Sequence, residues 1–159
     1  MSANEYRFRR AWHADAPTSD VFDLLYTVAR YPDWWPQVRH VERIGERSFR
    51  VRIRSVLPYV LRFELWQEVV DAQRGLLQVG MRGDLEGFSR WTLTANREGT
   101  SVRFDERASL TPALLRALDP VARPAFELNH SAMMRACERG MRAALSGLAL
   151  ARASRPPRE

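Results

Sequence analysis

Four polar side chains with acid–base or hydrogen-bonding chemistry interrupt stretches of sequence that are otherwise apolar. His130 lies near the middle of the apolar face of a long predicted helix, and Asn129 lies at the edge of that face. An imidazole on an apolar wall suits general acid or base catalysis, or a hydrogen bond to a ligand carbonyl. His130 is therefore the candidate catalytic residue, and both are candidate ligand contacts. The structural alternative is an imidazole satisfied by a backbone carbonyl or a water, with the Asn129 amide capping a neighbouring loop.

Arg10 and Glu106 are the other two, because each lies on the apolar face of a predicted strand. Arg10 alternates with Phe8 and Trp12, and Glu106 follows Phe104 at the same spacing. A charge that points inward needs a partner, since an unpaired buried charge is costly. One interpretation is a structural ion pair, and the other is a polar floor for a ligand or an acid positioned by its arginine.

The remaining candidate ligand contacts are aromatic or aliphatic. Trp34, Trp35 and Tyr59 lie in predicted loops or short elements, where the mouth of a cavity is expected. The others lie on predicted strands and on the long helix: Trp12, Ile53, Phe63, Trp91, Phe126, Met133 and Cys137. A place in the core is the alternative for all of these, since such residues dominate cores. Cys137 is the single cysteine and has no obvious activating charges, so we expect a buried filler and no disulfide.

Common catalytic and metal-binding motifs are absent from the sequence. It contains no glycine-rich phosphate loop, no HExxH and no serine in GxSxG. His13 and His40 lie among charged residues and far from His130 along the chain, which argues against a three-histidine metal site. We therefore expect neither a cofactor nor a bound metal.

The helix that carries His130 is predicted over residues 120–151. At about 100° per residue its apolar side holds Phe126, Met133, Cys137, Met141, Ala144 and Leu148. Gly140 leaves a gap beside these residues. Soft thioethers, an imidazole and missing side chains are typical of a pocket wall more than of a helix that only fills a core.

The preceding elements are predicted to form a sheet that this helix covers. Strand patterns occupy residues 6–13, 38–44, 48–56, 61–70, 73–81, 87–95 and 101–110. Helical patterns occupy residues 18–28 and 112–118, and residues 31–36 read as a short aromatic turn or helix. An antiparallel sheet needs cover on one face, and only the terminal helix is long enough to supply it. The space between them is the expected site.

Length and composition predict one globular domain over residues 1–151, followed by a flexible tail over 152–159. The 159 residues are 45% hydrophobic, no apolar run approaches the ~18 residues of a membrane span, and the start lacks a signal peptide. A cytoplasmic protein is expected. The net charge is +6, but the 25 basic residues are all arginine and are scattered, so no nucleic-acid partner is expected. Only Arg50, Arg52 and Arg54 form a local row, on the outer face of one strand.

The chain resembles the START-like superfamily, the helix-grip proteins also called SRPBCC. The resemblance rests on Asp15-Ala16-Pro17 before a helix with Val21-Phe22, on Tyr31-Pro32-Asp33-Trp34-Trp35-Pro36, and on the long closing helix. It covers nearly the whole chain, and is strongest to single-domain actinobacterial proteins called polyketide cyclase/dehydrase. It implies an α+β fold in which a curved seven-stranded antiparallel sheet wraps around the C-terminal helix, with two short helices after the first strand.

The resemblance also implies a function and one contact. Members commonly hold a hydrophobic small molecule between sheet and helix, and some are aromatase/cyclases that use a cavity arginine and tyrosine without metal. Their first and last strands are antiparallel neighbours, which would bring Arg10 and Glu106 together, so we expect these side chains to pair if both point inward.

Three functions are compatible with these residues and this resemblance. The first is binding of a hydrophobic, aromatic or polyketide-like small molecule, and the second is a polyketide aromatase/cyclase that removes water through His130. The third is a regulatory or partner-binding domain whose core is nearly closed, with no cavity of ~300 Å³. The oligomeric state is left open by the sequence.

Overall fold

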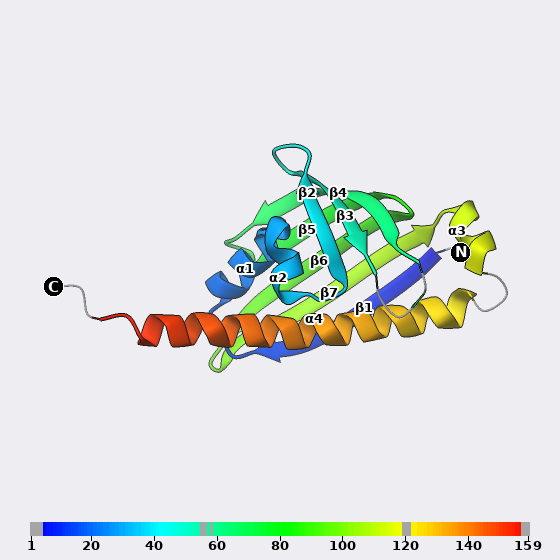
Figure 1. Cartoon of the computed structure of the whole chain (residues 1–159). Coiled ribbons are helices and arrows are strands. Elements are labelled where there is room, and N and C mark those ends of the chain that lie inside the picture. The colour runs from blue at the N-terminus through cyan, green and yellow to red at the C-terminus, as the bar shows by residue number, and fades with distance from the viewer. Residues whose placement is uncertain (1–4, 55–56, 58, 119–121, 157–159) are drawn as a thin grey trace.

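One antiparallel sheet of seven strands dominates the computed structural model, which describes residues 5–54, 57, 59–118 and 122–156 (Figure 1). The strands are β1 (Glu5–Ala14), β2 (Val38–Arg43), β3 (Ser48–Ile53), β4 (Leu61–Asp71), β5 (Leu76–Gly83), β6 (Leu85–Asn96) and β7 (Gly99–Leu110). Their order across the sheet is β1-β7-β6-β5-β4-β3-β2. Strands β2 to β7 therefore form a meander, and β1 joins it beside β7, the strand farthest from it in sequence.

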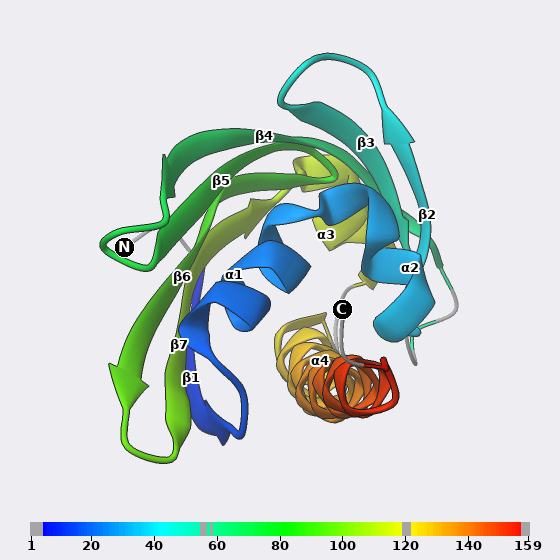
Figure 2. The ribbon, with the colours of Figure 1, turned by 90° about the vertical axis from the view of Figure 1, so that its left-hand side faces the viewer.

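The helices lie on the concave side of this sheet or at one end of it (Figure 1). They are α1 (Thr18–Tyr26), α2 (Tyr31–Trp34), α3 (Pro112–Leu118) and α4 (Ala122–Ala153), with a 3₁₀ turn η1 (Val28–Arg30) before α2. Figure 2 shows the sheet bending around α1 and α2, while α4 fills the open side between β1 and β2. The predicted helix-grip architecture is confirmed. No helix in the described ranges has the length and apolar composition that crossing a bilayer requires.

Alternation of side chains along the strands explains which face of the sheet is covered. In β3, Phe49, Val51 and Ile53 are buried against the helices, whereas Arg50 and Arg52 between them are exposed. A buried apolar side chain at every second position is typical of a sheet with one solvent-exposed face. The apolar face of α4 packs against the concave side of the sheet and completes the core.

Several predicted boundaries differ from the structure. The helix predicted over residues 18–28 ends at Tyr26, because the backbone of Thr27 leaves helical geometry with a ψ of 69°. The predicted strands over 48–56 and 73–81 are shorter at one end, and of the former, residues 55–56 lie outside the described residues. At the other end of the chain, α4 continues to Ala153, and Arg152 forms a two-point ion pair with Asp20 of α1.

Two expectations about the face of α4 are wrong. Leu148 is 41% exposed, because the last turns of α4 extend beyond the sheet (Figure 1). Gly140 leaves no gap: a Cβ at this position would lie only 1.8 Å from the backbone oxygen of Trp34. The missing side chain thus lets the backbone of α2 contact α4 directly.

Candidate functional site

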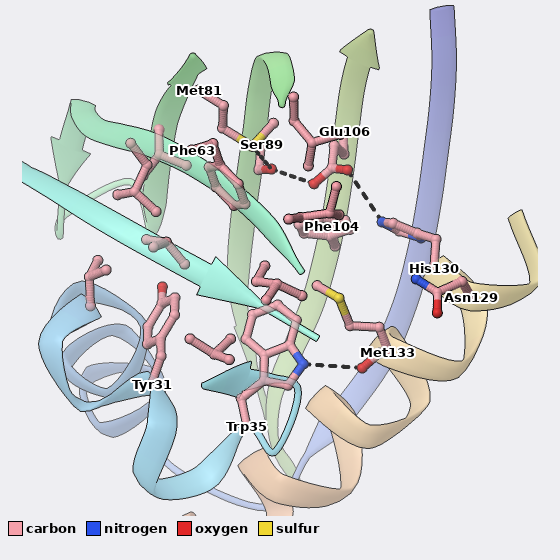
Figure 3. A pocket seen from close by; sticks show the side chains of 18 of the residues that line it. Tyr31, Trp35, Phe63, Met81, Ser89, Phe104, Glu106, Asn129, His130 and Met133 are labelled. Carbon is pink, nitrogen blue, oxygen red and sulfur yellow. Dashed lines mark hydrogen bonds and ion pairs between the residues drawn. The ribbon is translucent and has the colours of Figure 1, made fainter. Parts of the chain in front are cut away.

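An apolar cavity of about 80 Å³ lies between the concave face of the sheet and α4, with α2 at its side (Figure 3). Nine of the predicted contact residues line it: Trp35, Ile53, Phe63, Trp91, Glu106, Phe126, Asn129, His130 and Met133. All but Trp35, which directly follows α2, come from an inward position of a strand or from the inner side of α4. The structure therefore gathers residues from separate parts of the sequence around one space.

Three side chains in mutual contact, one each from β6, β7 and α4, form the polar end of the cavity. The Ser89 hydroxyl donates to Glu106 Oε2 at 2.6 Å, and Glu106 Oε1 lies 3.3 Å from His130 Nε2. Ser89 and Glu106 are directly opposite each other in the sheet, so the two strands hold them in register. The side chains of His130 and Glu106 are only 9% and 10% exposed. The contact between them is thus shielded from solvent.

Packing fixes the orientation of the His130 ring. Phe8 of β1 stacks on it with a centroid distance of 3.5 Å and an interplanar angle of 8°. Phe8 is also the β1 residue opposite Glu106, so one strand pair supplies both the stacking surface and the carboxylate. A ring clamped in this way loses little further freedom when it binds a ligand or transfers a proton.

The Nε2 atom of His130 keeps unused hydrogen-bonding capacity. It is buried, and it makes no hydrogen bond with the described residues, because the Glu106 oxygen lies within ion-pair distance but off the favourable hydrogen-bond direction. Buried polar atoms are nearly always satisfied, so an exception at a cavity wall points to a ligand or an ordered water. Chemically, the imidazole and the carboxylate can share or relay a proton at the boundary of an apolar space.

The expected pairing of Arg10 with Glu106 is wrong, although both residues point to the concave side. Arg10 lies opposite Phe104, one inward position away from Glu106 along the strand. Its guanidinium binds Glu138 of α4 at 3.0 Å, and Glu138 also binds Arg142 at 2.9 Å. The helix therefore supplies a separate partner to each of the two charges.

Four other predicted contacts, besides Arg10, lie outside the cavity. Trp12 packs edge-on against Trp91 with centroids 5.8 Å apart, and Trp34 stacks on Trp35 behind the cavity wall. Tyr59 lies in the β3–β4 connection, where burial raises the pKa of its phenol to about 12. Cys137 is fully buried and burial raises the pKa of its thiol, which agrees with the predicted role as a filler.

Two residues expected to line the cavity do so in a different way from the prediction. Trp35 is buried in the wall and not at a mouth, and its indole N–H donates to the Met133 carbonyl at 3.2 Å. Asn129 lines the cavity and also accepts the backbone N–H of Leu57 at 3.3 Å, the loop-capping role that was its structural alternative.

Among the residues that the structure describes, sequence reasoning missed eleven that line the cavity, of which Ser89 matters most chemically. Ser89 alternates with Trp91 along β6, and this spacing was a readable signal for an inward position. Tyr31 was recognised in its motif but not as a wall residue. Its hydroxyl donates to the Leu25 carbonyl at 2.6 Å, so it is a satisfied structural group. Within the described ranges, no three His, Cys, Asp or Glu side chains lie close enough to hold a metal ion.

Solved structures of low sequence identity share this fold. The aromatase/cyclase ZhuI from Streptomyces sp. R1128 superposes with a TM-score of 0.75 at 14% identity, covering 89% of this chain and 94% of that one. A START superfamily protein from Mycobacterium smegmatis gives 0.71 at 9% identity, covering 92% and 99%. The di-domain aromatase/cyclase StfQ of the steffimycin pathway gives 0.72 at 16% identity, and the match covers 92% of this chain but only 52% of that protein.

Sequence comparison identifies the family. No curated protein matches the sequence at a significant level. The family described as "Polyketide cyclase / dehydrase and lipid transport" matches residues 6–150. Since that match takes in every strand and most of α4, the chain belongs to this family, within the START-like superfamily.

Proposed function

We propose that this chain binds a small hydrophobic molecule, aromatic or polyketide-like, in the cavity between the sheet and α4. The observation that carries the proposal is an apolar cavity whose polar end is formed by Ser89, Glu106 and His130. Such a site buries an apolar ligand body and fixes its orientation through one hydrogen bond. Two of the structural neighbours are aromatase/cyclases, which supports an oxygenated aromatic or polyketide ligand.

The cavity volume limits the ligand. At about 80 Å³ it is smaller than the ~150 Å³ that holds benzene in an engineered apolar cavity. A ligand with one or two rings therefore requires wall side chains to move. Met81 and Met133 are the best suited to do so, because a thioether chain has three rotatable bonds and adapts to irregular shapes.

Fluorescence titration with 1-naphthol tests binding, because Trp35 and Trp91 line the cavity and report on its contents. A matched pair of variants locates the site: Val79→Leu enlarges a lining residue, and Val70→Leu enlarges a half-buried residue outside the lining. We expect Val79→Leu to weaken binding at least fivefold, and Val70→Leu to leave it unchanged. His130→Ala should cost no more than about tenfold, the value of one hydrogen bond.

Native mass spectrometry of the purified chain gives an independent measurement. A co-purified compound of low mass that is lost in Val79→Leu supports the proposal. A ligand-free chain that also fails to bind 1-naphthol would contradict it and would favour the regulatory domain with a closed core, for which the small cavity volume is the supporting observation.

A second candidate function is dehydration of the aromatase/cyclase type, favoured by the contact between Glu106 and His130. Dehydration of a β-hydroxy ketone removes a proton from the carbon between the two oxygen-bearing carbons and expels the hydroxyl group as water. The imidazole Nε2 would accept the carbon proton and Glu106 would stabilise the imidazolium, with Ser89 holding the carboxylate. The same proton would then leave with the hydroxyl group, so that the site returns to its starting state.

Turnover of a β-hydroxy ketone, followed by the absorbance of the enone product, separates the two functions. Removing a general acid or base costs 10²–10⁴-fold, so catalysis predicts a fall of ~10²-fold or more for His130→Ala. Glu106→Gln should lower turnover as well, whereas Ser89→Ala should have the smallest effect. Equal turnover in wild type and His130→Ala would remove His130 from the mechanism. It would not affect the proposal of ligand binding, which the 1-naphthol titration tests.

A further inference from the structure

Five basic side chains gather on the outer face of β2, β3 and β4, on the opposite side of the sheet from the cavity. We call them the outer cationic patch, and they line one shallow hollow: Arg39, His40, Arg52, Arg54 and Arg62. All five are exposed, and their side chains form no ion pair or hydrogen bond within the described part of the chain. Elsewhere on the sheet, arginines do form ion pairs with carboxylates on neighbouring strands.

The sheet register places two arginines directly opposite each other in this patch, with a histidine opposite one of them. Arg52 of β3 pairs with Arg62 on one side and with His40 on the other. Directly opposed like charges destabilise a sheet. Burial does not compensate for this repulsion, because these side chains are exposed to solvent.

The adjacent row of the same face has the opposite arrangement. There Arg50 lies between Glu42 and Glu64, with ion-pair distances of 3.1 and 3.5 Å. The next strand adds Arg82, whose guanidinium lies 3.4 Å from Glu64. The guanidinium groups of Arg50 and Arg82 in this matched row thus pair with carboxylates. Those of Arg52 and Arg62 pair with none in the described ranges, because Asp84 at the end of that row accepts the backbone N–H of Arg62.

A β-bulge in β2 adds another basic side chain to the outer cationic patch. The register of β2 against β3 shifts between Val38 and His40, so Arg39 is an extra residue on its strand. Both Arg39 and His40 are exposed and line the hollow. Bulges redirect side chains and are common beside functional sites, and this one adds a cation to the patch.

We propose that the outer cationic patch binds a phosphoryl group of the diphosphate class, carried by a small ligand. Several converging cations require a multiply charged anion, and the planar guanidinium fork matches phosphate oxygens with two hydrogen bonds. The matched row limits the size of the ligand. Glu42 and Glu64 border the patch and repel an extended polyanion, such as nucleic acid or an anionic membrane, that would cross them. This inference does not depend on the cavity or on the proposed function.

Isothermal titration calorimetry of the full chain with inorganic pyrophosphate tests the proposal. The ionic strength is kept low, because salt screens exposed charges. The double variant Arg52→Gln/Arg62→Gln removes two charges from the patch. The control Arg50→Gln/Arg82→Gln removes two charges from the matched row, so the net charge is the same. We expect the patch variant to weaken pyrophosphate binding at least tenfold and the control to change it less than twofold.

Thermal unfolding of Arg62→Glu checks that the effect is local. This change places a carboxylate opposite Arg52 but beside Asp84, whose Oδ2 accepts the backbone N–H of residue 62 at 2.8 Å, so the melting temperature in the absence of pyrophosphate should stay near the wild-type value, which also shows that the variant folds. Pyrophosphate should stabilise wild type and have no such effect on Arg62→Glu.

Three results would overturn the proposal. The first is no pyrophosphate binding by wild type, and the second is equal weakening in the two double variants, which would show a general effect of net charge. The third is co-sedimentation with phosphatidic acid vesicles that depends on Arg52 and Arg62 while soluble pyrophosphate does not bind. That result would assign the patch to a membrane surface.

Discussion

Replacing Gly140 by alanine tests the contact that positions α2 against α4. The added Cβ would lie 1.8 Å from the Trp34 backbone oxygen, and this distance has to lengthen to at least 3.4 Å for an ordinary contact. A side chain could rotate away, but a backbone oxygen moves only with its helix. The substitution must therefore displace α2, α4 or both, and α2 leads directly into Trp35 of the cavity wall.

The magnitude follows from two opposing terms. Alanine is favoured over glycine inside a helix by ~1 kcal/mol, and overpacking costs ~1–3 kcal/mol, with a backbone clash at the upper end. We therefore expect Gly140→Ala to lower the free energy of unfolding by about 2 kcal/mol. Gly147 is the matched control on the same helix, because a Cβ there meets nothing within 4 Å. Gly147→Ala should raise the free energy of unfolding by up to ~1 kcal/mol.

Urea unfolding followed by circular dichroism measures both variants, and 1-naphthol titration reports on the cavity wall. Gly140→Ala should be the less stable of the two and should change the affinity for 1-naphthol, whereas Gly147→Ala should leave that affinity at the wild-type value. If Gly140→Ala were as stable as Gly147→Ala, the close approach of Trp34 to α4 would not exist, and Gly140 would have no role in positioning α2.

Three further predictions concern buried and half-buried groups. Burial raises the pKa of Tyr31 above its ordinary 10.0, so stability from this group is complete below pH 10 and is lost above it. Between pH 9 and 11 the wild type should therefore lose about 1.4 kcal/mol of unfolding free energy in urea titrations that Tyr31→Phe does not lose, and equal losses in the two proteins would refute this. The Cys137 thiol is fully buried, so its reaction with Ellman's reagent should occur only at the rate of unfolding; faster labelling of the folded chain would show that it is accessible. Arg10→Gln leaves Glu138 with one cation fewer and should cost ~1 kcal/mol in urea unfolding, whereas Arg9→Gln at an 88% exposed side chain should cost almost nothing.

The fold was predictable because its signals are local. Alternation alone places Phe49, Val51 and Ile53 on one face of a strand, and seven such segments followed by one long helix leave few other architectures. The boundaries were less predictable, because they depend on single interactions. The backbone turns out of the helix at Thr27 and ends α1 early, and α4 continues to Ala153, where Arg152 pairs with Asp20 of α1.

The site was predictable residue by residue but not contact by contact. Sequence periodicity placed Arg10 and Glu106 on the concave face, where the structure has them. It could not assign their partners, since those come from α4. Glu138 and His130 lie about two helical turns apart on α4, and they meet Arg10 and Glu106 respectively. Matching them requires the axial position of the helix relative to the sheet, and no local pattern contains that information.

That axial position is set by a small number of close contacts. Gly140 against the Trp34 backbone fixes α4 at one point, and the stack of His130 on Phe8 fixes it at another, almost three turns toward the N-terminus. A helix held at both points cannot slide without breaking one of them. Gly140, which does not line the cavity, therefore helps to hold the imidazole beside Glu106. It follows that Gly140→Ala should disturb the contact between His130 and Glu106 as well as the position of Trp35, although it removes no group from either.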